Sequence, residues 1–313
     1  MPGIKRVAVG LALFLALSGC YSPPRLKDGL TPKSKIIQEY ITQIKKEYDI
    51  RELDNKVRYV EFPKISKDSI IILNDLDGSF KWYEELAREL NKNYAVYIFD
   101  KRGSGVNVHK KGSATDLVKD IDKLIDRIEK ENPNTKINLF ASCYGARRGL
   151  EFLIRKPGKL KSAILSSPAL YMEEIIDLNC IEKLGIAFSF IYGGTTRKVI
   201  PNDNFYTDNN EKLELIQRDP LRLKKVSNND YFWGELQLWK VRKNLKNLEK
   251  TKVPIKVFLG KKDKVIDTEK VKKRLRNIKN IEIEELPTSH LIYFDKENRD
   301  IFIEEIKDFI ESH

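Results

Sequence analysis

The sequence predicts an α/β fold with a mainly parallel sheet, helices on both faces and a mainly helical cap insertion. Along most of the chain, short apolar runs typical of buried parallel strands alternate with amphipathic helical segments. This alternation stops between residues 169 and 250, where helical pieces, a Gly193-Gly194 turn and polar loops contain no clear buried strand. We therefore expect one core in two parts, residues 36–168 and 251–313, with residues 169–250 covering the carboxyl edge of its sheet.

The first part of the core begins with a helix, because apolar residues recur at helical spacing between Ile36 and Tyr48. Residues 57–62 alternate in polarity as a strand does, and residues 69–73 form a short apolar run. The elements that follow are a helix at 80–90, a strand at 94–99, a helix at 114–129, a strand at 136–140, a helix at 144–155 and a strand at 162–165.

The second part of the core resumes the alternation after the insertion. Its elements are a strand at 255–259, a helix at 265–278, a strand at 281–285 and a helix at 301–310. In such units each helix returns the chain to the same edge of the sheet, so that successive strands are parallel. The second part is therefore expected to extend the same sheet.

Composition limits the classes of partner. The chain has 313 residues, of which 41% are hydrophobic and 33% charged, as in a soluble globular protein with a sizeable core. Its net charge is +12, but basic and acidic residues are interspersed without an Arg-rich face, so we expect no nucleic-acid partner. Contact with anionic lipid explains the charge equally well. Three scattered histidines and no clustered cysteines predict no metal site, and no cofactor is expected.

The N-terminus has the pattern of an export signal. Lys5 and Arg6 precede an apolar stretch, residues 7–17, that is too short to span a bilayer. The Leu-Ser-Gly-Cys that ends at Cys20 resembles the lipobox of bacterial lipoproteins. This predicts a signal peptide over residues 1–19, then a lipidated Cys20 and a tether to residue 35, and a location on the outer side of a bacterial cell-envelope membrane. An ordinary signal peptide with an incidental cysteine is the alternative.

Cys143 stands at the centre of a strand-turn-helix motif. Residues 141–145 read Ala-Ser-Cys-Tyr-Gly, the small-x-nucleophile-x-Gly pattern of a nucleophile elbow. The N-terminus of the following helix, together with Arg147 and Arg148, predicts a lowered pKa for the thiol. The alternatives are that Cys143 is a small buried apolar residue, or that it pairs with Cys180 in an oxidising compartment.

A thiol nucleophile needs a base and an acid that orients the base. His290 follows the strand at 281–285 by a short loop, whereas His109 lies in a Lys-rich loop and His313 ends the chain. Asp263 directly follows the strand at 255–259, although Asp267 is a nearby competitor. The order Cys143, Asp263, His290 is the order expected on an α/β scaffold of this kind.

These motifs together resemble those of the α/β-hydrolases. The resemblance rests on residues 141–145, the Gly-Lys-Lys-Asp that ends at Asp263, the Ser-His at His290, the Asp-Lys-Arg-Gly-Ser-Gly of residues 100–105, and residues 73–79. The most similar subgroup is the monoacylglycerol lipase, lysophospholipase and serine aminopeptidase-like set. The resemblance implies an oxyanion hole formed by the backbone N–H groups of Leu76 and Tyr144.

The sequence departs from the family pattern at two places. Cys143 replaces the usual serine, and Asn74-Asp75 replaces the usual His-Gly before the oxyanion donor. The carboxylates of Asp75 and Asp77 oppose a developing oxyanion unless they point away from it.

The resulting hypothesis is a membrane-anchored hydrolase that cleaves carboxylic esters of lipids through a Cys143-His290-Asp263 triad and an acyl-enzyme. Aromatic and aliphatic residues of the insertion, over 184–191 and 232–239, are expected to be ordinary core or an acyl-binding roof. Two alternatives stay open. One is an acyltransferase or thioesterase with the same triad, and the other is a decayed site in a lipoprotein that binds a ligand or partner.

Overall fold

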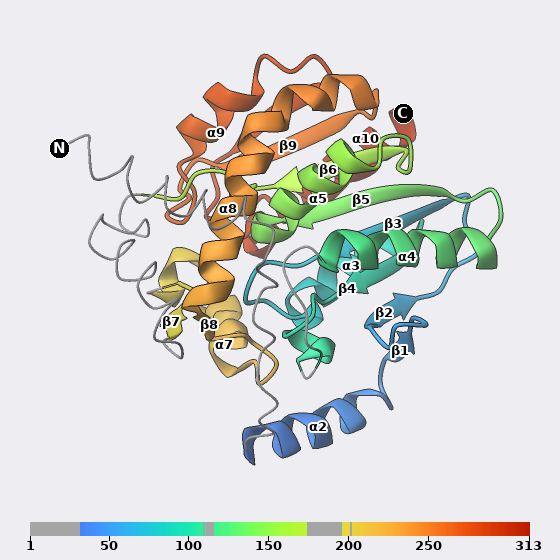
Figure 1. The fold of residues 1–313 in the computed structure, drawn as a ribbon, viewed down its shortest axis with the longest axis vertical. Helices are drawn as coiled ribbons and strands as arrows, with labels where there is room; N and C mark the ends of the chain where they lie inside the picture. Colours follow the sequence, from blue (N-terminus) through green and yellow to red (C-terminus); the bar gives the residue numbers. More distant parts are fainter. Residues whose placement is uncertain (1–31, 109, 111–115, 174–195, 201) are drawn as a thin grey trace, which may run out of the picture.

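An eight-stranded sheet forms the centre of the computed structural model, which describes residues 32–108, 110, 116–173, 196–200 and 202–313 (Figure 1). Its strand order is β1-β2-β4-β3-β5-β6-β9-β10. The strands are β1 (Asp49–Glu52), β2 (Arg58–Phe62), β3 (Asp68–Leu73), β4 (Ala95–Phe99), β5 (Lys136–Ser142), β6 (Ser162–Ser166), β9 (Ile255–Gly260) and β10 (Ile281–Leu286).

The sheet is mainly parallel, which confirms the predicted fold class. β1 pairs antiparallel with β2 and β2 antiparallel with β4, whereas every pair from β4 to β10 is parallel. β1 was not predicted from the sequence. It is a short, largely exposed edge strand, and its residues have no apolar pattern to reveal it.

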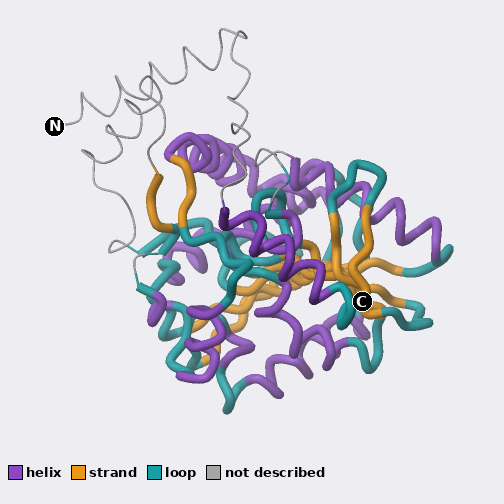
Figure 2. Tube along the Cα trace, turned by 90° about the horizontal axis from the view of Figure 1, so that it is seen from below, coloured by secondary structure: helices purple, strands orange, loops and turns teal. Residues whose placement is uncertain are grey.

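Helices cover both faces of the sheet (Figure 2). α3 packs with α10 and α4 with α5, which places these pairs in separate layers. The helices of the core are α2 (Pro32–Ile44), α3 (Glu84–Leu90), α4 (Asp116–Glu131), α5 (Cys143–Arg155), α9 (Thr268–Leu275) and α10 (Arg299–Ser312), and the 3-10 turns are η1 (Phe80–Tyr83), η2 (Gly105–Asn107) and η5 (Ile292–Phe294). α9 is shorter than the predicted helix at 265–278, because the residues before it form a turn that ends at the N-cap Asp267.

Burial follows the sequence periodicity. β4 is completely buried, and so is β5 beyond its first residue, as parallel strands with helices on both faces must be. α4 buries the apolar face that its sequence predicted, which comprises Leu117, Ile121, Leu124 and Ile128. Each such side chain stabilises the fold by about 1.5–3 kcal/mol relative to an exposed one. This core holds the carboxyl ends of β3, β5, β9 and β10 in fixed positions.

The described part of the insertion between β6 and β9 is mainly helical. It contains η3 (Asp203–Phe205), α7 (Asn210–Arg218), α8 (Asn228–Asn244) and η4 (Leu245–Thr251), and a short antiparallel pair, β7 (Thr196–Lys198) and β8 (Lys225–Ser227), that the sequence did not predict. Residues 184–191, named above for an acyl-binding roof, lie outside the described residues, and so does Cys180.

The predicted signal segment and Cys20 also lie outside the described residues. Within the described part of the chain, no helix combines the length and the apolar character needed to cross a bilayer.

Candidate active site

Cys143 lies at a sharp turn between β5 and α5. Its φ is 48°, a left-handed conformation that costs energy for any residue with a side chain and is typical of a nucleophile elbow. A Cβ at Gly145 would lie 2.5 Å from the carbonyl oxygens of Leu73 and Asn74. Only glycine therefore fits at this position, and the loop after β3 packs directly against the first turn of α5.

His290 and Asp263 meet beside this elbow. His290 Nδ1 lies 2.8 Å from Asp263 Oδ2, and neither side chain is exposed. The other carboxylate oxygen, Oδ1, accepts the backbone N–H groups of Val265 at 2.8 Å and Ile266 at 2.9 Å. Asp263 is thus held at both oxygens, which fixes the direction in which it presents Oδ2 to the imidazole.

The loop that carries His290 is held against the end of β9. The N–H of Lys262 donates to the carbonyl of Thr288 at 2.9 Å. A Cβ at Gly260 would lie 2.5 Å from the carbonyl oxygen of Ser289, so this close approach requires glycine. The sequence motif that ends at Asp263 therefore also supplies the space that the His290 loop needs.

The competing residues lie elsewhere. Asp267 caps α9, where its Oδ1 accepts the N–H of Lys270 at 2.9 Å. His313 is exposed at the end of α10 and lies beside Phe309. His109 lies outside the described residues.

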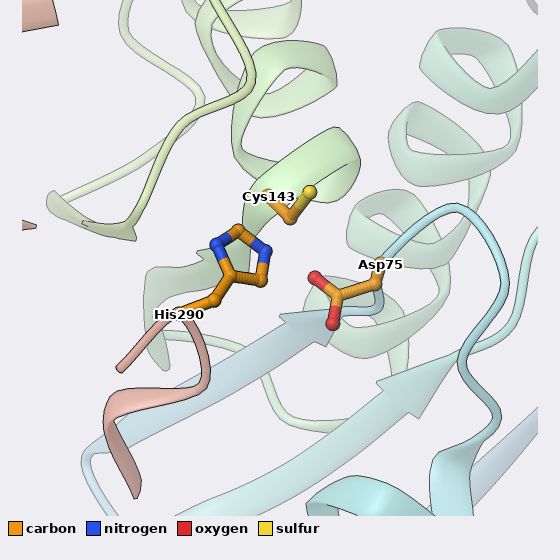
Figure 3. Close-up of side chains that lie close together, drawn as sticks. All are labelled: Asp75, Cys143 and His290. Atoms are coloured by element: carbon orange, nitrogen blue, oxygen red, sulfur yellow. The ribbon is translucent and has the colours of Figure 1, made fainter. Parts of the chain in front are cut away.

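Cys143 is a buried free thiol that faces His290 and Asp75 (Figure 3). Sγ of Cys143, a ring nitrogen of His290 and a carboxylate oxygen of Asp75 all lie within 4.8 Å of one another. Burial raises the pKa of the thiol above its ordinary value, although the positive charge of His290 opposes the rise. The prediction of a lowered thiol pKa was therefore wrong.

The two arginines named in that prediction are engaged by other groups. Arg148 is fully buried and pairs with Glu151 and Gln237. The guanidinium of Arg147 lies 4.5 Å from the centre of the Tyr144 ring. Both residues lie near the elbow in the sequence, but their guanidinium groups contact side chains of α5 and α8.

His290 favours its charged form. Burial opposes this, but the negative charge of Asp263 and the interaction with the Cys143 side chain raise the pKa of His290 well above its ordinary value. Nε2 of His290 makes no hydrogen bond of ordinary geometry within the described residues, but its contact with the Cys143 side chain also raises the pKa of His290. It points toward the space between Cys143 and Asp75 (Figure 3).

The two acidic residues of the loop after β3 differ sharply. The carboxylate of Asp77 does not repel an oxyanion, because both of its oxygens are hydrogen-bonded. Arg222 Nε donates to Oδ2 at 2.9 Å, and Tyr206 Oη donates to Oδ1 at 2.6 Å. Asp75 is 1% exposed, and its carboxylate lies beside the hydroxyl groups of Ser142 and Tyr83, which lower its pKa but do not make hydrogen bonds of ordinary geometry with it. Burial raises its pKa to about 6, while the positive charge of His290 limits the rise. Of the two carboxylates, Asp77 therefore points away from a developing oxyanion and Asp75 does not.

The predicted oxyanion donors lie on the two segments that Gly145 brings together. Tyr144 is the second residue of α5, and Leu76 lies in the loop after β3. Thiol, imidazole and carboxylate are also the donor types of zinc sites, so the cluster of Cys143, His290 and Asp75 could hold a metal ion. The elbow position of Cys143 instead favours acyl chemistry. The sequence did not predict this donor cluster, because its members are far apart in the chain.

Comparisons with known proteins identify the family of the chain. Residues 65–297 match the Hydrolase_4 family model, described as serine aminopeptidase, S33. The chain belongs to this family. It is 23% identical to a probable lysophospholipase L2 of Haemophilus influenzae, over 75% of this chain and 80% of that protein.

Two solved structures show the fold shared with this S33 family member. The monoacylglycerol lipase of Paleococcus ferrophilus has 20% identity and a TM-score of 0.71, over 82% of this chain and 99% of that one. A monoglyceride lipase of Saccharomyces cerevisiae, solved with a substrate analogue, has 14% identity and a TM-score of 0.69, over 85% and 94%. These likenesses confirm the α/β-hydrolase fold.

Sequence reasoning missed three features of this S33 site. Tyr206 and Arg222 of the insertion bind Asp77, and no local sequence pattern predicts that contact. Asp75 was noted only as a hindrance to the oxyanion. A carboxylate in place of the family's glycine, directly before the oxyanion donor, was the signal that could have identified it as a neighbour of the nucleophile.

Proposed function

We propose that the protein is a carboxylic ester hydrolase that acts on acyl esters of lipids and uses Cys143 as its nucleophile. One observation carries this proposal: the hydrogen-bonded pair of His290 and Asp263 lies beside a buried thiol at a strained elbow. The names of the relatives, a lysophospholipase and two monoacylglycerol lipases, support lipid acyl esters as the substrate class.

The mechanism follows from the positions of these groups. The thiol of Cys143 gives its proton to a side chain beside it, Sγ attacks the acyl carbonyl, and the N–H groups of Leu76 and Tyr144 stabilise the oxyanion. The Nε2 proton of His290 then passes to the leaving alkoxide. The acyl-enzyme is hydrolysed by a water molecule that neutral His290 deprotonates. Asp263 keeps the imidazole in the required orientation throughout.

A thiol nucleophile shapes the expected substrate range. A thiolate departs from a tetrahedral intermediate more readily than an alkoxide, so the alkoxide leaves only when it is protonated early. Activated esters and thioesters should therefore be cleaved faster than plain esters, and amides slowest. The same property favours a second candidate activity, acyl transfer to an alcohol or thiol. Product analysis with added glycerol distinguishes transfer from hydrolysis.

The central test compares two neighbouring substitutions. Purified wild-type protein, Cys143→Ala and Ser142→Ala are assayed on monoacylglycerol and lysophosphatidylcholine with the same medium-length acyl chain. Cys143→Ala should lose activity by about 10⁴-fold or more. Ser142→Ala is the matched control, because it removes the adjacent hydroxyl and leaves the thiol. Equal activity of Cys143→Ala and wild type would contradict the proposal.

We also propose that Cys20 carries the lipid that holds the enzyme at the envelope membrane, close to lipid substrates. The lipobox-like sequence and the basic net charge support this placement. Cys20→Ser should move the protein from the membrane fraction to the soluble fraction and abolish incorporation of a palmitate analogue. Retention in the membrane fraction without label would argue against the anchor.

A further inference from the structure

We propose that Asp75 is the proton acceptor for the Cys143 thiol, so that one nucleophile is served by two proton-transfer groups, Asp75 and His290. This inference rests on the proposed function, because it assigns a step of that same reaction. It goes beyond a triad by giving a role to a side chain that the triad does not use.

The position of Asp75 is the first argument. A carboxylate oxygen of Asp75 lies within 4.8 Å of both Sγ of Cys143 and a ring nitrogen of His290. Neither Asp75 oxygen makes a hydrogen bond of ordinary geometry in the described part of the chain, although the hydroxyls of Ser142 and Tyr83 lie beside the carboxylate, and the side chain is 1% exposed. A buried carboxylate with open lone pairs is costly to the fold, and such costs are concentrated at functional sites. Its open oxygens lie beside the one group of the site whose proton must leave.

The state of His290 is the second argument. Asp263 accepts from its Nδ1, and Asp75 lies on the side of Nε2 (Figure 3). The negative charge of Asp263 is the largest effect that raises the pKa of His290, which therefore favours the imidazolium. An imidazolium has no lone pair to accept the thiol proton. Burial, together with the charges of Asp75 and Asp263, raises the pKa of the thiol, so the thiol proton needs an acceptor other than an imidazolium.

The groups that face Asp75 from each packed element are consistent with this role. These groups are Asp77 of the same loop, Tyr83 of η1, Ser142 at the end of β5, Cys143 of α5, His290 of the loop after β10 and Tyr293 of η5. Asp77 is neutralised by Arg222. Tyr83 and Tyr293 keep their protons, because burial raises the pKa of each well above 10.0. Among these groups, Asp75 is the one whose pKa, about 6, lies near neutral pH.

The proton balance of the cycle closes with these groups alone. The thiol proton moves to Asp75, and the thiolate forms a bond to the acyl carbon. Imidazolium His290 gives its Nε2 proton to the alkoxide as the ester C–O bond breaks. Neutral His290 then takes a proton from water, whose oxygen bonds to the acyl carbon. The C–S bond breaks, the leaving thiolate takes back the proton held by Asp75, and the resting state is restored.

The deciding experiment measures the rate at which iodoacetamide alkylates Cys143 in the full chain, from pH 5 to pH 9. Cys143 is located by peptide mass spectrometry. In the wild type, the rate should fall as pH decreases through about 6, where Asp75 becomes protonated. In Asp75→Asn, this acid limb should disappear, and the rate at pH 7 should fall at least about tenfold. Asp75→Glu keeps a carboxyl and should retain the limb.

A purely structural or hindering role for Asp75 predicts the opposite sign. If its charge only repels the thiolate, Asp75→Asn lowers the thiol pKa and speeds alkylation. A faster rate in Asp75→Asn would therefore overturn the proposal. Asp77→Asn is the matched control from the same loop, since Arg222 keeps Asp203 at 2.7 Å. Its alkylation rate should stay within about threefold of wild type.

Two further readouts separate this inference from the function on which it rests. Alkylation needs no ester, so a wild-type protein that hydrolyses no ester but shows the acid limb refutes the proposed function and not the role of Asp75. Ester turnover is also measured with EDTA and with added Zn²⁺. Turnover that persists in EDTA supports proton transfer, whereas turnover that depends on Zn²⁺ would show that the same atoms are ligands and would overturn the proposal.

Discussion

Asp263 and Asp75 both follow the carboxyl ends of parallel strands and both approach His290, but they are held in opposite ways. Asp263 accepts three hydrogen bonds, from Val265, Ile266 and His290. Asp75 accepts none of ordinary geometry from the described residues, although its side chain is as buried as that of Asp263. Hydrogen bonds favour the charged form of a carboxyl, and burial without them favours the neutral form. The first arrangement suits a group that orients a base, and the second suits a group that exchanges a proton.

The difference is decided by the loops rather than by the strands. The turn after β9 directs two backbone N–H groups at one oxygen of Asp263. In the loop after β3, the backbone N–H of Asp75 itself donates to Tyr83 Oη at 3.2 Å. Among the described residues of the insertion, Tyr206 and Arg222 bind Asp77. Two carboxylates of similar depth thus receive different partners because different segments close over them.

The largest effect is expected from a substitution of Asp263, the carboxylate that is held by hydrogen bonds. Asp263→Asn keeps the shape of the side chain but removes the charge that orients His290, so kcat should fall by about 10⁴-fold with little change in KM. Steady-state kinetics on an activated ester measures this. Asp267→Asn is the control, with kcat within about twofold of wild type. An Asp263→Asn enzyme that kept a tenth of the wild-type kcat would show that Asp263 does not orient the base.

The next largest effect is expected when Asp77 loses its paired cation, because Asp77 is then buried without a cation, as Asp75 is. Arg222→Leu leaves Asp77 as a second buried carboxylate without its cation, and the free energy of unfolding should fall by about 3–5 kcal/mol. Urea denaturation at pH 7.5 measures it. The double variant with Asp77→Asn should recover part of the loss, because no charge is then left unpaired. Strictly additive losses would contradict a direct pairing.

The smallest effect concerns the loss of folding stability that the buried carboxylate of Asp75 causes when it is charged. Because burial raises the pKa of Asp75 to about 6, the folded state binds a proton that the unfolded state has released, and stability is lost as pH rises from about 4 through 6. Asp75→Asn lacks this loss. Its stability relative to wild type should therefore rise by about 3 kcal/mol between pH 4 and pH 7.

Asp267→Asn should change the stability of the protein with pH in the direction opposite to that of Asp75→Asn. Although partial burial opposes it, hydrogen bonds from Lys270 lower the pKa of Asp267, so its contribution is present near neutral pH and is lost as pH falls. This variant should therefore be destabilised more at pH 7 than at pH 4. An Asp75→Asn profile parallel to that of Asp267→Asn would show that Asp75 is an ordinary paired carboxylate.

Much of the fold could be predicted because its signals are local. Apolar runs located the seven strands from β2 to β10 in the core sheet, and turn residues placed Cys143, Asp263 and His290 at the ends of elements. The short edge strand β1 and the β7–β8 pair were missed, since neither is long or apolar enough to produce a pattern. The start of α9 was misplaced because a turn that ends at Asp267 precedes the helix.

By itself, the sequence determined the fold class, the strained elbow and the chain order of the thiol, acid and base, because periodicity and turn chemistry act between near neighbours. Only the tertiary structure decided the electrostatics. It buried Cys143 and thereby raised the thiol pKa, directed Arg147 and Arg148 elsewhere, paired Asp77 with Arg222 and left Asp75 open beside the thiol. Charge and desolvation depend on which distant segments close over a group, and no local pattern encodes that.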